Sequence, residues 1–245
     1  IKAEGLTGKT WMGKLDSNGP TDEKFMEDVG RDSLLFIPCT TDLSQPLEIF
    51  YFLHGNRGFG GPKDLNDFKT RAAPKIKEMG LDGRNIIWVI PELPWSSGDE
   101  SKQALAKGTG RAIPKRQKSL LAKGNLEGID FVQFHQDIMV IIEELEPSFD
   151  ESLVTYISMA GHSAGGAALW WAAESGALET LAVNKITFSD ADYFGGAKKV
   201  WAKYFGGGKV PGGLGAEIGA ELNLLVQDPS NRGAHNPTAS ALRFI

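Results

Sequence analysis

The residues with the clearest chemical potential form the pentapeptide Gly161-His162-Ser163-Ala164-Gly165. A Gly-x-Ser-x-Gly motif alone is weak evidence, because both residue types are common and short motifs recur by chance. Here it follows an apolar run typical of a strand and precedes an alanine-rich run typical of a helix. Glycines permit a sharp strand-to-helix turn, and N–H groups at the helix start can hold negative charge. We therefore predict a nucleophile elbow at Ser163; the alternative is a tight turn in which Ser163 caps the helix.

A serine nucleophile needs a base that takes its proton, and the sequence contains four histidines. His162 is adjacent to the serine and should point elsewhere, and His135 lies inside a predicted helix. His54 ends an apolar strand and opens a glycine-rich loop, where we expect it to bond loop backbone. His235, in the loop after the last predicted strand, remains as the candidate base.

An orienting carboxylate would complete such a group, and three aspartates stand at or beyond the ends of apolar runs. Asp190 and Asp192 come where the run beginning at Ile186 ends, and Asp228 follows the run at 222–226. The residues alone leave these three candidates open. The aspartates that do not serve the base are expected to cap loops.

Apolar periodicity and turn residues divide the chain into alternating strands and helices. Strands are expected at 33–38, 47–54, 86–90, 153–159, 186–190 and 222–226. Helices are expected at 62–79, 129–145 and 164–175 and around Trp201, and a glycine-rich connector at 206–219. Residues 1–32 are expected to form an irregular arm or short edge strands. The alternation predicts a doubly wound α/β domain.

With these features the chain resembles the α/β-hydrolase family over roughly residues 33–240. The resemblance rests on Gly161 to Gly166, on the strand ending in His54-Gly55, and on the chain order serine, aspartate, histidine. It implies a mostly parallel sheet with helices on both faces. Because one clear strand separates Asp190 from His235, the end of the sheet looks shortened.

The resemblance also implies the roles of individual residues. Ser163, Asp190 and His235 would form the catalytic triad, since some members carry the acid directly at a strand end. The N–H groups of Ala164 and Asn56 would form the oxyanion hole, with Arg57 as the neighbouring alternative to Asn56.

The implied activity is hydrolysis of a carboxylic ester, small or polymer-borne, through an acyl-enzyme on Ser163. An amidase or peptidase would use the same triad, and a non-catalytic binding protein could use the same fold. We expect no cofactor. We also expect no metal, because the sequence has no His-Glu-x-x-His or comparable ligand spacing.

Composition bounds the remaining properties. A chain of 245 residues fits a single domain over 1–245. The net charge of −5 and the lack of a basic stripe with interleaved aromatics argue against nucleic acid as a partner. The basic stretch 94–128 is expected to be an insertion, either a lid that favours anionic substrates or a solvated loop.

No apolar run is long enough to span a membrane, and the first 30 residues lack the apolar core of a signal peptide. We expect a soluble protein, cytoplasmic or secreted after removal of a leader. Cys39 is the only cysteine, so no internal disulfide can form, and we expect a buried structural thiol. The sequence does not indicate an oligomeric state.

Overall fold

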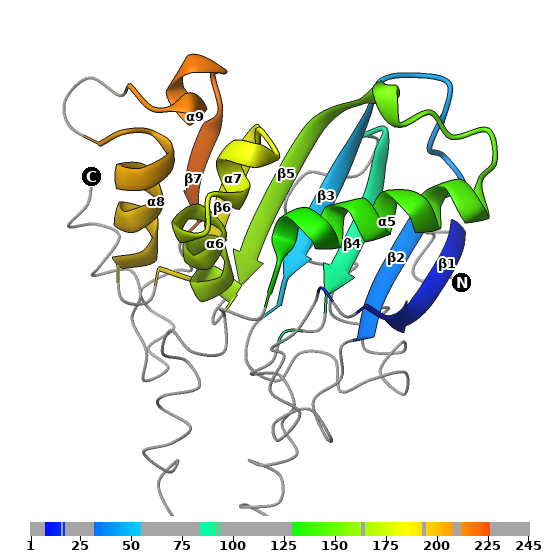
Figure 1. Cartoon of the computed structure of the whole chain (residues 1–245), viewed down its shortest axis with the longest axis horizontal. Coiled ribbons are helices and arrows are strands. Elements are labelled where there is room, and N and C mark those ends of the chain that lie inside the picture. Colours follow the sequence, from blue (N-terminus) through cyan, green and yellow to red (C-terminus); the bar gives the residue numbers. More distant parts are fainter. Residues whose placement is uncertain are drawn as a thin grey trace, which may run out of the picture.

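In the computed structural model of the chain, seven strands of the described residues form one mixed sheet, in the order β1-β2-β4-β3-β5-β6-β7 (Figure 1). Their bounds are β1 Gly8–Lys14, β2 Asp32–Pro38, β3 Leu47–Leu53, β4 Ile86–Pro91, β5 Val154–His162, β6 Lys185–Ser189 and β7 Glu221–Leu225. The structure describes residues 8–15, 17, 32–54, 84–91, 93, 129–162, 165–192, 195–207 and 212–225.

Most of the sheet is parallel. β1 pairs antiparallel with β2, and β2 pairs antiparallel with β4. The five strands β4, β3, β5, β6 and β7 run parallel to one another. All side chains of β3 are buried, as expected for a parallel strand covered on both faces. The predicted mostly parallel α/β fold is confirmed, and the first strand is one of the short edge strands that we expected before residue 32.

The described helices are α5 Phe131–Leu145, α6 Gly165–Glu174, α7 Ala177–Thr180, α8 Gly196–Tyr204 and α9 Leu214–Glu217, with a 3₁₀ turn η4 at Glu151–Leu153. The longest, α5, crosses in front of β2, β3 and β4 (Figure 1). It begins where the side chain of Asp130 accepts hydrogen bonds from the N–H groups of Val132 and Gln133. Its buried positions follow the period of a helix and point at the sheet; they are Phe131, Phe134, His135, Ile138, Met139, Ile141 and Ile142.

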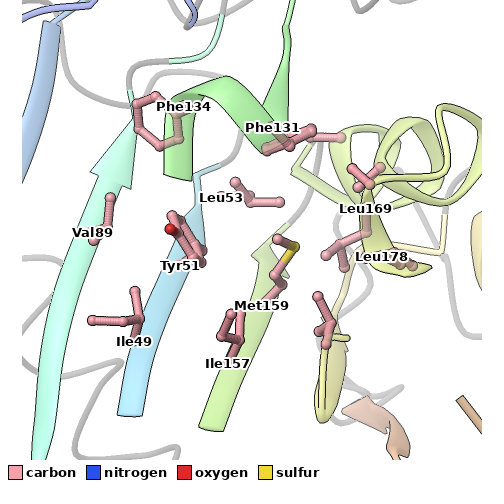
Figure 2. Close-up of a cluster of buried hydrophobic side chains, with 14 of the residues drawn as sticks. Ile49, Tyr51, Leu53, Val89, Phe131, Phe134, Ile157, Met159, Leu169 and Leu178 are labelled. Carbon is pink, nitrogen blue, oxygen red and sulfur yellow. The ribbon is translucent and has the colours of Figure 1, made fainter. Parts of the chain in front are cut away.

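Two clusters of buried side chains lie on the two faces of the sheet. The larger joins β3, β4 and β5 to α5 and α6, as the side chains of Tyr51, Val89, Met159, Phe134 and Leu169 illustrate (Figure 2). The smaller contains alternate residues of β2, β3 and β4 together with Ala160 of β5. Among the described helices, α5 to α9 all contribute to the larger cluster and none contributes to the smaller. The helix expected at 62–79 and the insertion expected at 94–128 lie outside the described residues.

The expectation for Cys39 is wrong. Its side chain is exposed and free, because β2 ends at Pro38 and the chain turns at the next residue. Apolar residues before a cysteine do not bury it once the strand has ended. In the described part of the chain, no helix is long and apolar enough to cross a membrane. The single domain over 1–245 stays a prediction.

Candidate active site

The predicted elbow stands between a strand and a helix. β5 ends at His162 and α6 begins at Gly165. Ser163 and Ala164, the two residues between them, lie outside the described residues. The strand before the motif and the helix after it are confirmed.

Three glycines of this turn occupy positions where a side chain would collide with backbone. A Cβ atom on Gly161 would lie 2.8 Å from the carbonyl carbon of Gly165. A Cβ atom on Gly165 would lie 1.9 Å from the carbonyl oxygen of Leu53, and one on Gly166 would lie 1.9 Å from the carbonyl oxygen of Ala191. The turn therefore packs against the ends of both neighbouring strands, β3 and β6, at distances that only glycine allows.

The carboxyl ends of the parallel strands are level with one another. Leu53 pairs with Gly161, and His162 pairs with Ser189. Ser189 in turn pairs with Leu225, so β3, β5, β6 and β7 end along one edge. The chain goes from β3 to β4 on one side and then to β5 on the other, which makes the gap between β3 and β5 a topological switch point. Ligands of open α/β sheets bind outside the carboxyl ends at such points.

His54 follows β3 at this edge and is 3% exposed. Its Nε2 accepts a 2.8 Å hydrogen bond from the backbone N–H of Leu93, two residues beyond the end of β4. The expectation that His54 bonds loop backbone is confirmed. Asn56 and Arg57, the predicted oxyanion donors after it, lie outside the described residues.

Asp190 is the first residue after β6, and its N–H donates a 2.9 Å hydrogen bond to the carbonyl oxygen of Leu225. Its φ of 46° is in the left-handed region, which aspartate tolerates better than most residues. Asp190 thus directly follows β6, the strand next to β5, and comes after Ser189, which pairs with His162. Its role as triad acid stays a prediction.

Asp192 has a structural task in the same turn. It is 3% exposed, and its Oδ1 accepts a 2.8 Å hydrogen bond from the N–H of Ala197 in the first turn of α8. The bond supplies an acceptor for an N–H at the start of α8, whose N-cap residue is Gly195. The third candidate acid, Asp228, and the candidate base, His235, lie outside the described residues.

Two of the buried polar groups among the described residues were not predicted from the sequence and lie on or against β3. Glu48 of β3 accepts a hydrogen bond from the hydroxyl of Ser158 and pairs with Arg84. Tyr51 bonds His135, which is buried as a structural residue of α5. The signal for the first group was visible, since Glu48 is the single charged residue in the run 47–53. Among the described residues, no group of three or more His, Cys, Asp or Glu could hold a metal ion.

No protein-family model and no curated protein matches the sequence. Solved structures similar to the chain include a poly(3-hydroxybutyrate) depolymerase from Bordetella parapertussis, at 12% identity and a TM-score of 0.41, covering 77% of this chain and 53% of that one. A ferulic acid esterase from Anaeromyces mucronatus is 12% identical with a TM-score of 0.42, covering 99% of this chain and 91% of that one. Carboxyl esterase 2 from Tuber melanosporum is 18% identical with a TM-score of 0.38, covering 76% and 46%.

The chain spans 61% and 53% of the length of the first two structures that it matches, a ferulic acid esterase and the depolymerase. By their names, these similar proteins are esterases or a depolymerase, and the chain resembles them at these levels of identity.

Proposed function

We propose that the chain is a serine hydrolase that cleaves a carboxylic ester through an acyl-enzyme on Ser163. The observation that carries the proposal is the turn between β5 and α6, whose glycines at 161, 165 and 166 pack directly on backbone of the turn and of its neighbours. Such packing is what a nucleophile elbow requires, and the turn borders the topological switch point of the sheet. We therefore expect a serine carried by that turn to lie where substrates of this fold class bind.

The proposed reaction has two halves. Nε2 of His235 takes the proton of Ser163 while the Oγ attacks the carbonyl carbon, and Asp190 orients the imidazole and stabilises its positive charge. The N–H groups of Ala164 and Asn56, or of Arg57 in place of Asn56, hold the oxyanion. The intermediate collapses, and His235 gives its proton to the departing alcohol. Water then attacks the acyl-enzyme by the same route and releases the acid.

The same residues would cleave an amide. We test the ester first because it is the substrate class of the proposed function. The sequence does not define the acyl group or the alcohol. A series of p-nitrophenyl esters of increasing chain length measures the acyl preference directly, because the leaving group stays constant while the acyl group grows.

A fluorophosphonate probe tests the nucleophile, since it reacts covalently with activated serines. The wild-type protein should be labelled and should hydrolyse at least one ester of the series, and Ser163→Ala should do neither. Ser175→Ala is the matched control, because Ser175 follows the C-terminal end of α6, whereas the elbow precedes its N-terminal end. Undiminished labelling of the Ser163→Ala protein would overturn the assignment.

A further inference from the structure

We infer that His54 is a positioning residue of the active site: its neutral imidazole ties the end of β3 to the segment after β4 and thereby fixes the backbone that leads into the oxyanion-holding loop. The inference rests on the proposed serine hydrolase function. It concerns a side chain that touches neither substrate nor nucleophile in that mechanism.

The protonation of His54 follows from its bond. The N–H of Leu93 can only donate, so Nε2 of His54, 2.8 Å away, must accept and cannot carry a proton. A neutral ring then carries its proton on Nδ1. Because His54 is 3% exposed, water cannot readily take the place of this bond. A buried N–H left without an acceptor is costly, so the fold keeps this bond.

Leu93 is a firm anchor for the bond. It is fully buried in the larger core cluster, together with Phe131 and Phe134 of α5. The hydrogen bond therefore connects the end of β3 to a point whose own position is set by core packing. Loss of the bond would remove this link between the end of β3 and the core.

A shift of the end of β3 would also displace the start of α6, which directly follows the elbow. The carbonyl oxygens of Leu53 and His54 lie 1.9 and 3.0 Å from the position of a Cβ atom on Gly165. Gly165 is two residues after Ser163 and opens α6. The backbone position that the imidazole of His54 holds therefore affects both proposed sources of oxyanion donors, the loop after β3 and the start of α6.

Oxyanion donors act only when they are placed within about 0.5 Å of the productive geometry. Loss of one such donor lowers kcat by about 10²–10³-fold, and displacement of a donor should cause a smaller decrease in kcat. The ground-state ester makes weaker use of the donors than the tetrahedral intermediate does. We therefore expect changes at His54 to lower kcat while KM changes little.

Two amide substitutions separate the hydrogen bond from the volume of the ring. In His54→Gln the side-chain oxygen can reach the position of Nε2, whereas in His54→Asn it ends near Nδ1 and falls short of Leu93. We expect the Asn protein to lose about tenfold or more in kcat, a fraction of a full donor's contribution, and the Gln protein to recover most of that loss. His135→Asn is the control for a change at another buried histidine, and should lower stability without lowering kcat.

The selective measurement is the ratio of kcat/KM for an ester to that for its thionoester, because sulfur is a weak hydrogen-bond acceptor. A displaced oxyanion hole should shrink this ratio in His54→Asn, and His54→Gln should restore it. If the Asn protein does not fold, His54→Leu replaces it as the variant without an acceptor. An unchanged ratio, or a kcat loss that His54→Gln does not recover, overturns the inference. Failure of the proposed function would show itself separately, as absence of probe labelling and hydrolysis in the wild-type protein.

Discussion

The hydroxyl of Tyr51 on β3 lies 2.5 Å from Nδ1 of His135 on α5, and both side chains are buried. Burial lowers the pKa of His135 from 6.5 to about 4, so its ring is neutral near pH 7. Burial also raises the pKa of Tyr51, so its hydroxyl keeps its proton, and it donates to Nδ1 when the neutral His135 ring carries its proton on Nε2. This bond fastens the helix to the strand whose end leads to the candidate active site.

The first prediction is a loss of stability in mild acid that depends on His135. Between pH 6.5 and about 4 the unfolded chain binds a proton at this residue that the folded chain does not. The free energy of unfolding should therefore fall by about 1.4 kcal/mol per pH unit as the pH drops through this window, by about 3 kcal/mol in all. Urea denaturation at pH 7.0, 5.5 and 4.5 measures the fall.

His135→Asn is the matched variant for this prediction, because its side-chain oxygen lies near the position of Nδ1 and can still accept from Tyr51. It should be less stable at pH 7 and should lack the acid-dependent fall. Glu48, whose pKa burial raises, has the opposite dependence and gains stability as the pH falls. Both proteins contain Glu48, so the difference between their pH curves isolates His135. Parallel curves would contradict the assignment.

The second prediction concerns the buried carboxylate of Glu48. Burial raises its pKa, whereas the Ser158 hydroxyl and the Arg84 guanidinium act in the opposite direction. Arg84→Ala should leave an unpaired buried charge and lower the free energy of unfolding by about 2–3 kcal/mol at pH 7, the lower end for a buried pair because Arg84 is partly exposed. The loss should shrink in acid, where Glu48 is protonated.

Chemical denaturation of the wild-type and Arg84→Ala proteins at pH 7 and pH 4.5 measures this second effect. Lys203→Ala is the control, because the pair of Lys203 with Glu174 is 3.7 Å long and lies at the surface. That variant should change stability by less than about 1 kcal/mol. An equal loss at both pH values in Arg84→Ala would mean that Arg84 stabilises the fold by packing and not by charge.

The parts of the fold that the sequence predicts well are those that local pattern determines. The fully buried run of β3 and the Gly-x-Ser-x-Gly turn after β5 carry their own signals, apolar continuity and glycine. α7 and α9 have four residues each and show too few positions for a helical period. Exposure of Cys39 depends on where β2 ends, which composition alone does not fix.

Contacts between distant residues escape this kind of prediction. Tyr51 and His135 are 84 residues apart, and Ser158 and Glu48 are 110 apart. Both bonds depend on which strand lies next to which and on the face that a helix presents. The elbow glycines are an intermediate case. The motif is visible in the sequence, but the close backbone contacts that exclude a Cβ atom, with Leu53 and Ala191, appear only when β3 and β6 are placed on either side of β5.

The third prediction tests the close packing of Gly165 against the backbone of Leu53. In Gly165→Ala the added methyl group would lie 1.9 Å from the carbonyl oxygen of Leu53, so backbone must move. We expect the free energy of unfolding to fall by about 1–3 kcal/mol and kcat to fall by about 10²-fold, as expected for a displacement near 1 Å. Gly212→Ala is the control, since a Cβ there meets nothing within 4 Å. A Gly165→Ala protein with wild-type kcat would contradict the close packing of the turn.

The last prediction identifies the triad acid. If Asp190 orients His235, Asp190→Asn should lower kcat by about 10⁴-fold, because the amide favours the wrong tautomer of the histidine. Asp192→Asn should change kcat little, since its Oδ1 can still accept from the N–H of Ala197 and cap α8. Asp228→Asn tests the competing assignment, in which Asp228 is the triad acid. kcat on one p-nitrophenyl ester, with melting temperatures to verify folding, ranks the three variants. Were Asp228→Asn the crippling change instead, the acid would follow β7, one strand farther from the elbow than Asp190.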